Sequence, residues 1–271
     1  MTSDKGNDIN KNIKGIYCEI EYAAASDTGK VRGVNEDYFK VIEGNPLFPL
    51  AFIIADGMGG HNAGEIASMT AVESAYSYLS GSFKELTDVS DIRDRILMVF
   101  RKANTEVFNN SLVNNETAGM GTTLLMAVIK DNEVFIGNIG DSRAYVMRNG
   151  ELKRLTVDHS YVEELVRKGS LTREEAERHP RRNVLTRAVG CDSEVEADII
   201  KEPAGDRDVF LLCTDGLTNM VPETLICRLL VESPIPEEAC KKLIMYANEN
   251  GGADNITVIV FSKDRRNEVK Q

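Results

Sequence analysis

The chain has 271 residues, of which 42% are hydrophobic and 28% are charged, values typical of a globular protein with one large domain or two small ones. The formal net charge of −11 argues against nucleic acid as a main partner, because binding to phosphate backbones requires a surplus of Lys and Arg. No apolar stretch approaches the roughly 18–20 residues that a membrane span needs, so no contact with a membrane is expected.

Cysteines and termini indicate where the protein works. The five cysteines are odd in number, widely separated and never spaced as Cys-x-x-Cys, which favours a reducing compartment over a disulfide framework. Residues 1–15 are polar and lack the apolar core of an export signal. We therefore expect a cytoplasmic monomer with a disordered lead-in over 1–15, a single domain over 16–263 and a polar tail over 264–271.

Strand-like runs lie at 17–24, 37–43 and 48–55. A helix is predicted over 63–79, because apolar residues recur there at helical spacing with small residues between them. The residues expected on its inward face are Ile66, Met69, Val72, Tyr76 and Leu79. A second helix is predicted to begin near Ser90, a suitable N-cap. Its inward face is expected to carry Ile92, Ile96, Val99, Ala103 and Val107.

Four strands then follow in quick succession, at 122–129, 133–139, 143–147 and 151–155. Asp131-Asn132 is typical of a tight turn, and Asn149-Gly150 indicates a hairpin. Such short connections require antiparallel pairing, since parallel neighbours need long crossovers.

The stretch 160–178 is charged and predicts two short helices. Gly169 ends the first helix, and Thr172 with Glu175 forms a capping box for the second. A strand at 209–214, a helix near 236–249 and a strand at 256–261 complete the domain. Strands in blocks and helices in blocks indicate an α+β fold with antiparallel sheets.

Five aspartates sit at turn-like breaks beside apolar segments, and this pattern is the main indication of function. They are Asp37, Asp56, Asp141, Asp215 and Asp254. A strand that stops at Asp-Gly places a carboxylate at the end of a sheet, and several such ends together would form an all-oxygen site for hard divalent cations. Any one of them alone is more simply explained as a turn residue.

The residue types present narrow the metal chemistry. Only three histidines and scattered cysteines occur, so a zinc site of the usual type is disfavoured, whereas aspartates favour Mg²⁺ or Mn²⁺. Two such ions about 3.5–4 Å apart can share a hydroxide that attacks phosphorus in line. No Cys is followed by Arg six positions later, which disfavours a cysteine-nucleophile phosphatase, and the glycines at 57–60 do not form a Walker loop.

Two side chains outside the aspartates are candidates for a role at phosphate. Arg32 precedes Asp37 by five residues and suits bidentate phosphate capture, although a solvated surface arginine explains it equally well. His61 follows the glycine turn and could protonate a leaving alkoxide, or simply be a polar residue before a helix. His159 and His179 are expected to be structural or exposed.

Taken together, these stretches resemble the metal-dependent, type 2C (PPM-type) serine/threonine protein phosphatases in their bacterial form. The signature Asp-Gly-Met-Gly-Gly-His at 56–61 is one of a set that stands in the family's order from about residue 22 to 261. The other matching segments are 26–37, 63–65, 119–123, 140–143, 155–160, 186–190, 213–217 and 254–257.

The resemblance implies a β-sandwich of two antiparallel sheets flanked by helices, in αββα layers, with a small helical flap at about 159–190. It implies that two core ions, Mn²⁺ or Mg²⁺, bind to Asp37, Asp56, Asp215 and Asp254, assisted by the carbonyl of Gly57. Asp141, with Asp215, would hold a third and weaker ion, and Arg32 would grip the phosphoryl group.

The function implied is hydrolysis of phosphoserine and phosphothreonine in proteins by a metal-bridging hydroxide, in opposition to a cognate bacterial Ser/Thr kinase. Met58 stands where eukaryotic members have a general-acid His, which leaves His61 as a displaced candidate. Asn219 stands where some members have a further Asp for the third ion. Two alternatives stay open, a catalytically silent module that binds phosphoproteins through the flap and a phosphatase confined to one regulatory protein.

Overall fold

Two antiparallel sheets packed face to face form the centre of the protein. The computed structural model describes residues 12–17, 19–44, 50–60, 63–81, 92–113 and 115–263. One sheet has the order β1 (Asn12–Tyr17), β2 (Ile20–Asp27), β12 (Ile256–Lys263), β11 (Val209–Cys213), β8 (Arg143–Arg148) and β9 (Glu151–Arg154). The other has the order β10 (Asp198–Pro203), β7 (Glu133–Ile139), β6 (Leu124–Lys130), β4 (Leu50–Met58) and β3 (Asp37–Glu43), with β5 (Gly121–Thr122) also paired to β4.

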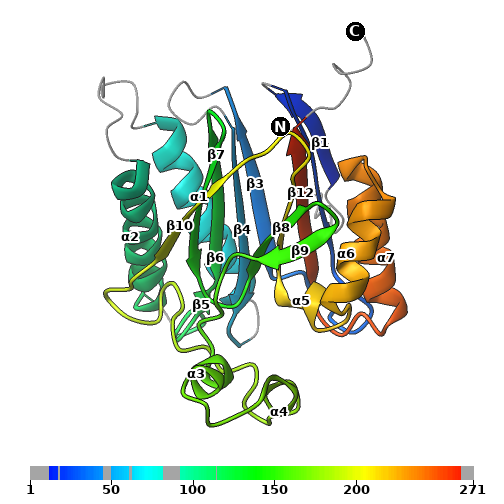
Figure 1. The fold of residues 1–271 in the computed structure, drawn as a ribbon. Coiled ribbons are helices and arrows are strands. Elements are labelled where there is room, and N and C mark those ends of the chain that lie inside the picture. The colour runs from blue at the N-terminus through cyan, green and yellow to red at the C-terminus, as the bar shows by residue number, and fades with distance from the viewer. Residues whose placement is uncertain are drawn as a thin grey trace, which may run out of the picture.

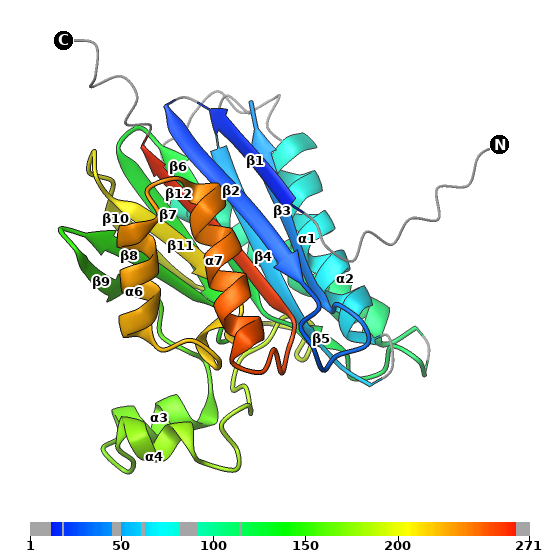
Figure 2. The ribbon, with the colours of Figure 1, turned by 90° about the vertical axis from the view of Figure 1, so that its right-hand side faces the viewer.

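Helices cover the outer face of each sheet, so the molecule has four layers (Figure 1). α1 (Ala63–Gly81) and α2 (Ile92–Ser111) lie on the β3–β4–β6–β7 side, and α6 (Glu223–Glu232) and α7 (Pro236–Glu249) lie on the β2–β12–β11 side. Figure 2 shows α6 and α7 side by side across the sheet that contains β2, β12 and β11. The expected α+β sandwich of two antiparallel sheets flanked by helices is confirmed.

Three layers of hydrophobic residues hold these elements together. Between the sheets, Phe261 stacks on Phe52 and Phe210, with ring centroids 4.7 and 5.0 Å apart. Two further clusters fill the spaces between each sheet and its helices. Because both faces of the central strands are covered, β4, β6, β11 and β12 are continuous apolar runs rather than alternating ones.

The inward face of α1 differs from the prediction. Val72 and Leu79 are buried as expected, but Met69 is 42% exposed, and Ile66 and Tyr76 are only partly buried at the edge of the core. The buried stripe consists largely of alanines, namely Ala63, Ala67, Ala71 and Ala75. Small side chains let the helix approach the sheet closely, so the large apolar residues do not mark its inner face. The predicted inward residues of α2 are all buried.

Several predicted boundaries and turns can be compared directly with the structure. Asp131, Asn149 and Gly150 have positive φ at the two tight turns, as the hairpin pairing requires. Residues 12–15 of the predicted lead-in instead pair with β2, and Lys14 forms a 2.6 Å ion pair with Glu237 of α7. The rest of the lead-in, the tail over 264–271, the N-cap Ser90 and His61 lie outside the described residues. β10, α6 and a short α5 (Asp215–Thr218) were not predicted.

Two short helices project beyond one end of the sandwich (Figures 1 and 2). They are α3 (Tyr161–Arg167) and α4 (Arg173–Glu177), within the segment that we call the flap, residues 159–190. Ser160 caps α3, Thr172 and Glu175 form the predicted capping box, and Gly169 has a φ of 71° after α3. Within the described residues, no helix combines the length and apolar character that a membrane crossing requires.

Candidate metal centre

The five aspartates lie at one end of the sandwich, where strands of both sheets begin or stop. Asp37 is the first residue of β3 and lies opposite Asp56 of β4 in the antiparallel register. Asp215 follows β11 and Asp254 precedes β12, and these two strands are paired neighbours in the other sheet. Asp141 lies in the connection that crosses from β7 of one sheet to β8 of the other. Segments far apart in the sequence therefore meet at one place.

Burial, together with mutual repulsion, raises the pKa values of four of these carboxylates. Burial, followed by repulsion from the other four aspartates, raises the pKa of Asp56 well above its usual value. Burial raises the pKa of Asp37 to about 7 and that of Asp215 to about 6, and Asp254 adds repulsion to both. Burial and the charge of Asp215 also raise the pKa of Asp141 well above its usual value. Divalent cations would relieve this repulsion.

One oxygen of Asp37 indicates where such a cation fits. Asp37 Oδ1 is buried, and no residue in the described part of the chain donates a hydrogen bond to it, although its other oxygen is fully engaged. A buried carboxylate oxygen without a donor is costly unless a cation contacts it. No three Asp, Glu, His or Cys side chains among the described residues converge closely enough to hold one ion by themselves. Aspartates that are spaced in this way suit Mg²⁺ or Mn²⁺, because these ions keep several water ligands and need few protein ligands.

Hydroxyl groups orient Asp37 through a directed chain of hydrogen bonds. The hydroxyls of Thr214 and Thr257 donate to Asp37 Oδ2 at 2.9 and 2.7 Å. Because Thr257 donates there, it accepts from the hydroxyl of Ser26 at 2.7 Å, and Ser26 in turn accepts from the amide of Asn35 at 2.8 Å. Asn35 Oδ1 accepts from the backbone N–H of Asp37 at 3.1 Å, which closes the loop. These positioning residues were not predicted from the sequence, although Thr214 lies next to Asp215 and Thr257 lies three residues after Asp254.

Two further polar side chains, Asn219 and His159, form hydrogen bonds beside Asp215 and Asp141. Asn219 Nδ2 donates to Asp215 Oδ2 at 3.0 Å, so this side chain orients a predicted ligand. His159 is buried, and its Nδ1 accepts from the backbone N–H of Gly140 at 3.1 Å, next to Asp141. The proton therefore lies on Nε2, which faces Asp198 at 3.2 Å, and burial lowers the pKa of this imidazole. His159 is structural, as predicted.

Arg32 lies on an exposed loop beside the aspartates. Its Nη2 donates to Asp254 Oδ2 at 2.9 Å, while its side chain remains 48% exposed. The hydrogen bond to Asp254 raises the pKa of the guanidinium, so Arg32 stays charged. Asn255 fastens this loop, because its amide donates to the carbonyls of Thr28 and Val34 at 2.9 and 3.0 Å. The predicted phosphate-binding residue thus lies at the edge of the site.

Gly57 is held where a larger residue has no room. A Cβ at this position would lie 2.0 Å from the carbonyl oxygen of Gly64 and 2.8 Å from that of Glu36. The Gly57 N–H donates to the Glu36 carbonyl at 3.1 Å, which ties β4 to the residue before Asp37. The glycine is therefore required by close backbone approach.

Of the remaining histidines, only one can be placed. His61 lies outside the described residues, so its role stays a prediction. His179 is in the flap, where its ring lies 5.9 Å from that of Tyr161. It does not line the groove that runs from Asp141 and Asp215 to α3 and α4 of the flap.

A charged cluster that the sequence analysis missed lies behind Asp141 and Asp215. The guanidinium of Arg143 contacts both oxygens of buried Asp158, with Nη2 at 2.8 Å, and Arg154 forms a second ion pair with the same carboxylate. Arg143 opposes the rise in pKa of both Asp141 and Asp215. Because Arg143 is paired with Asp158, it does not replace a cation at the aspartates.

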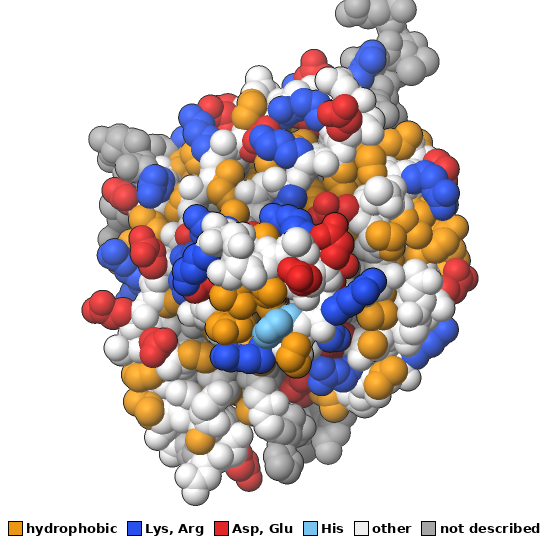
Figure 3. All heavy atoms as spheres, turned by 60° about the horizontal axis from the view of Figure 1, so that its bottom comes forward, with side chains coloured by type: hydrophobic (Ala, Val, Ile, Leu, Met, Phe, Trp, Pro, Cys, Tyr) orange, Lys and Arg blue, Asp and Glu red, His pale blue; other side chains and the backbone are white. Residues whose placement is uncertain are grey.

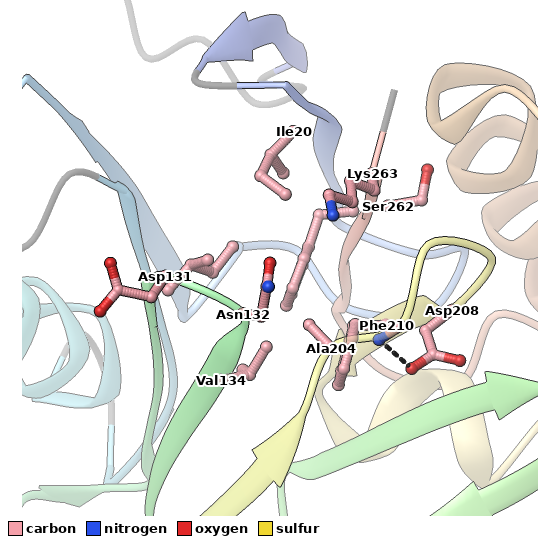
Figure 4. A pocket seen from close by; sticks show the side chains of 12 residues that line it. Ile20, Asp131, Asn132, Val134, Ala204, Asp208, Phe210, Ser262 and Lys263 are labelled. Carbon is pink, nitrogen blue, oxygen red and sulfur yellow. Dashed lines mark hydrogen bonds between the residues drawn. The ribbon is translucent and has the colours of Figure 1, made fainter. Parts of the chain in front are cut away.

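A small cavity lies at the opposite end of the sandwich from the aspartates (Figure 4). Its volume is about 20 Å³, enough for one water molecule, and Ile20, Val134, Phe210 and Lys263 are among the residues that line it. None of the predicted site residues lies there, so it plays no part in the metal centre.

Comparison with known proteins identifies relatives that match most of the chain. The family model described as "Protein phosphatase 2C" matches residues 30–234. The serine/threonine phosphatase stp of Listeria monocytogenes serotype 4b is 41% identical over 242 residues, which cover 88% of this chain and 94% of that protein.

Solved structures are similar over the same extent. The serine/threonine phosphatase of S. agalactiae superposes with a TM-score of 0.83 at 34% identity, covering 90% of this chain and 99% of that one. The catalytic domain of the serine/threonine protein phosphatase PstP, solved in complex with two manganese ions, has a TM-score of 0.77 at 34% identity, covering 90% and 97%.

Proposed function

The chain belongs to the protein phosphatase 2C family, and from that premise we propose which of its residues carry out the reaction. It is a metal-dependent hydrolase that removes phosphate from serine and threonine residues of phosphorylated proteins.

The proposed ligands of two core ions, Mn²⁺ or Mg²⁺, are Asp37, Asp56, Asp215 and Asp254, with the carbonyl of Gly57. Asp141 and Asp215 are the proposed ligands of a third ion. This ion binds more weakly because the nearby residue Asn219 lacks a carboxylate. The observation that carries the proposal is the buried Oδ1 of Asp37, which lacks a donor among the described residues at the point where five repelling carboxylates meet. The relative solved with two manganese ions supports the two-ion count.

The chain's own groups bind and orient the substrate. When bound, the ions supply an activated water for in-line attack and neutralise the phosphoryl oxygens. Among the described residues, the guanidinium of Arg32 donates one hydrogen bond, to Asp254, so most of its N–H groups remain for phosphoryl oxygens. Thr214 and Thr257 fix one oxygen of Asp37 and leave the other for a cation. His61 is the proposed general acid.

Phosphate release from a phosphothreonine peptide, with and without Mn²⁺, tests the proposal. Wild-type protein should release phosphate only with the metal, and Asp37→Asn and Asp215→Ala should lose most of that activity. Asp131→Asn, at a turn where φ is already positive at 56°, is the matched control for loss of one carboxylate and should keep it. Arg32→Gln should lower kcat/KM about 10- to 100-fold, as expected when one or two charge-assisted hydrogen bonds are lost.

The same assay separates the enzyme from the two alternatives. A folded wild-type protein that binds Mn²⁺ but releases no phosphate from any peptide would favour a silent binding module. Rapid turnover of one phosphoprotein, with negligible turnover of peptides, would favour a phosphatase confined to a single partner.

The proposed setting is the cytoplasm, where the enzyme opposes a Ser/Thr kinase as a monomer. The four described cysteines, Cys191, Cys213, Cys227 and Cys240, are free thiols, which supports a reducing compartment. Dephosphorylation of an autophosphorylated kinase from the same cell, together with light scattering at micromolar concentration, tests the partner and the monomeric state.

A further inference from the structure

A groove of about 1000 Å³ joins the metal centre to the flap. Asp141 and Asp215 lie in its wall beside α3 and α4 on one side and residues 218–224 on the other. Apolar side chains such as Val162, Val166 and Met220 line it together with charged ones. Figure 3 shows this end of the molecule, where acidic and basic side chains lie side by side and are interrupted by hydrophobic ones.

Several of the charged groups in this groove already form ion pairs. Asp158 is neutralised by Arg143 and Arg154. Glu163 forms an ion pair with Arg173 at 3.2 Å. Charges that are paired in this way contribute little to recognition of a ligand, because binding would first have to break the existing pair.

Two arginines in the groove lack such an ion pair among the described residues. Arg178 and Arg182 both line it and are exposed, and neither forms an ion pair with any residue that the structure describes. Arg181, between them in sequence, is instead held over the ring of Tyr161 at 3.9 Å and does not line the groove. Among the described residues, the groove therefore presents two guanidinium groups without ion pairs. Apart from Asp141 and Asp215 of the metal centre, its unpaired carboxylates are those of Glu177 and Glu223, and Glu223 accepts a 2.9 Å hydrogen bond from the hydroxyl of Tyr145.

We propose that this groove binds the polypeptide next to the phosphorylated residue, and that Arg178 and Arg182 select substrates with acidic side chains there. The inference rests on the proposed function, because the groove adjoins Asp141 and Asp215. An arginine fork pairs with a carboxylate in two parallel hydrogen bonds, which gives selectivity for acidic residues over amides. The net charge of −11 would by itself disfavour acidic peptides, so an acidic preference has to come from the groove.

Three phosphothreonine peptides of equal length provide the test. They differ only at the positions three to five residues before and after the phosphothreonine, which are Glu in the first peptide, Gln in the second and Lys in the third. Wild-type enzyme with Mn²⁺ should show a kcat/KM about two- to twentyfold higher for the Glu peptide than for the Gln peptide, as two partly exposed ion pairs allow. The preference should weaken as salt is added. The double variant Arg178→Gln/Arg182→Gln should lose it.

The controls separate this inference from the proposed function. Arg167→Gln removes an exposed arginine of α3 that does not line the groove, and should keep the preference. Hydrolysis of p-nitrophenyl phosphate, which has no acidic side chain to pair with the arginines, should be equal in all variants. Peptide binding measured by fluorescence anisotropy should show the same ranking without turnover. Equal kcat/KM and binding for the Glu and Gln peptides in the wild type, or a preference that survives in the double variant, would overturn the inference.

Discussion

Replacing Thr257 with valine should weaken metal binding while leaving the fold intact. The hydroxyl of Thr257 donates to Asp37 Oδ2 at 2.7 Å and accepts from Ser26 at 2.7 Å, and the side chain is fully buried in β12. Valine has nearly the same shape, so the change removes the hydrogen bonds without opening a cavity. Asp37 would keep the donor from Thr214 but would be free to turn.

The magnitude follows from the charge on Asp37. A hydrogen bond to a charged group contributes about 1.5–3 kcal/mol, and loss of a partner that orients a metal ligand typically weakens affinity about 10- to 100-fold. We therefore expect the Kd for Mn²⁺ to rise by about 10- to 100-fold. In the metal-free protein at pH 6, Asp37, whose pKa is raised to about 7, is mostly neutral. The free energy of unfolding should then fall by only about 1 kcal/mol, the contribution of a neutral hydrogen bond.

Calorimetric titration with Mn²⁺ at pH 8 and pH 6 measures the effect. The hydrogen bonds from Thr257 and Thr214 lower the pKa of Asp37, so removing one raises this pKa further. Protons then compete more strongly with the metal, and the deficit in affinity should be larger at pH 6. Thr117→Val is the matched control, because it removes a partly buried 2.8 Å hydrogen bond from a buried threonine to the Asn110 carbonyl, away from the site. A Thr257→Val protein that binds Mn²⁺ as tightly as the wild type would show that the hydroxyl merely fills space.

Three further outcomes are expected. In the folded protein the pKa values of Asp37 and Asp215 are raised to about 7 and 6, so the metal-free protein should lose up to a few kcal/mol of stability as the pH rises from about 4 to 7. Mn²⁺ should therefore raise Tm more at pH 8 than at pH 5.5. Equal increases in Tm at the two pH values would contradict the mutual repulsion. Gly57→Ala places a Cβ 2.0 Å from the Gly64 carbonyl oxygen and should lower the free energy of unfolding by about 1–3 kcal/mol in thermal melts. At Gly60 a Cβ would have no atom within 4 Å, so Gly60→Ala should change the free energy of unfolding by less than about 0.5 kcal/mol. Asp56→Asn should raise the Tm of the metal-free protein at pH 8, by about 2–4 °C for each kcal/mol of repulsion relieved, and should abolish phosphate release. A lower Tm would mean that repulsion from the other aspartates does not destabilise the fold at Asp56.

The fold was largely predictable where the local sequence alone determines an element. The apolar runs of β4, β11 and β12 and the Asn149-Gly150 turn are strong signals, and the structure contains each of them. β10 was missed because it is an edge strand with few buried residues that ends at Pro203, so its pattern is weak. α6 was missed although Ile226, Leu229 and Leu230 are buried at helical spacing, a signal that could have been read.

The candidate site was only partly predictable. The five aspartates were identified, but their convergence depends on the register of strands that lie far apart in the sequence, such as Asp37 opposite Asp56. Local patterns contain no such register, and the family resemblance supplied the expectation. The roles of Thr214, Thr257 and Asn219 are also tertiary, because each depends on which carboxylate lies within reach of a short polar side chain.

The choice of hydroxyls around Asp37 explains how the site can be buried and still open to metal. An arginine paired directly with Asp37 would neutralise the carboxylate, and a cation would first have to break that pair. In the structure, Arg32 instead pairs with Asp254 at the exposed edge, and Arg143 pairs with Asp158 behind the site. Hydroxyls orient one oxygen of Asp37 without cancelling its charge, and its other oxygen keeps no donor among the described residues. The repulsion that destabilises this end of the sandwich is therefore retained as the driving force for binding divalent cations.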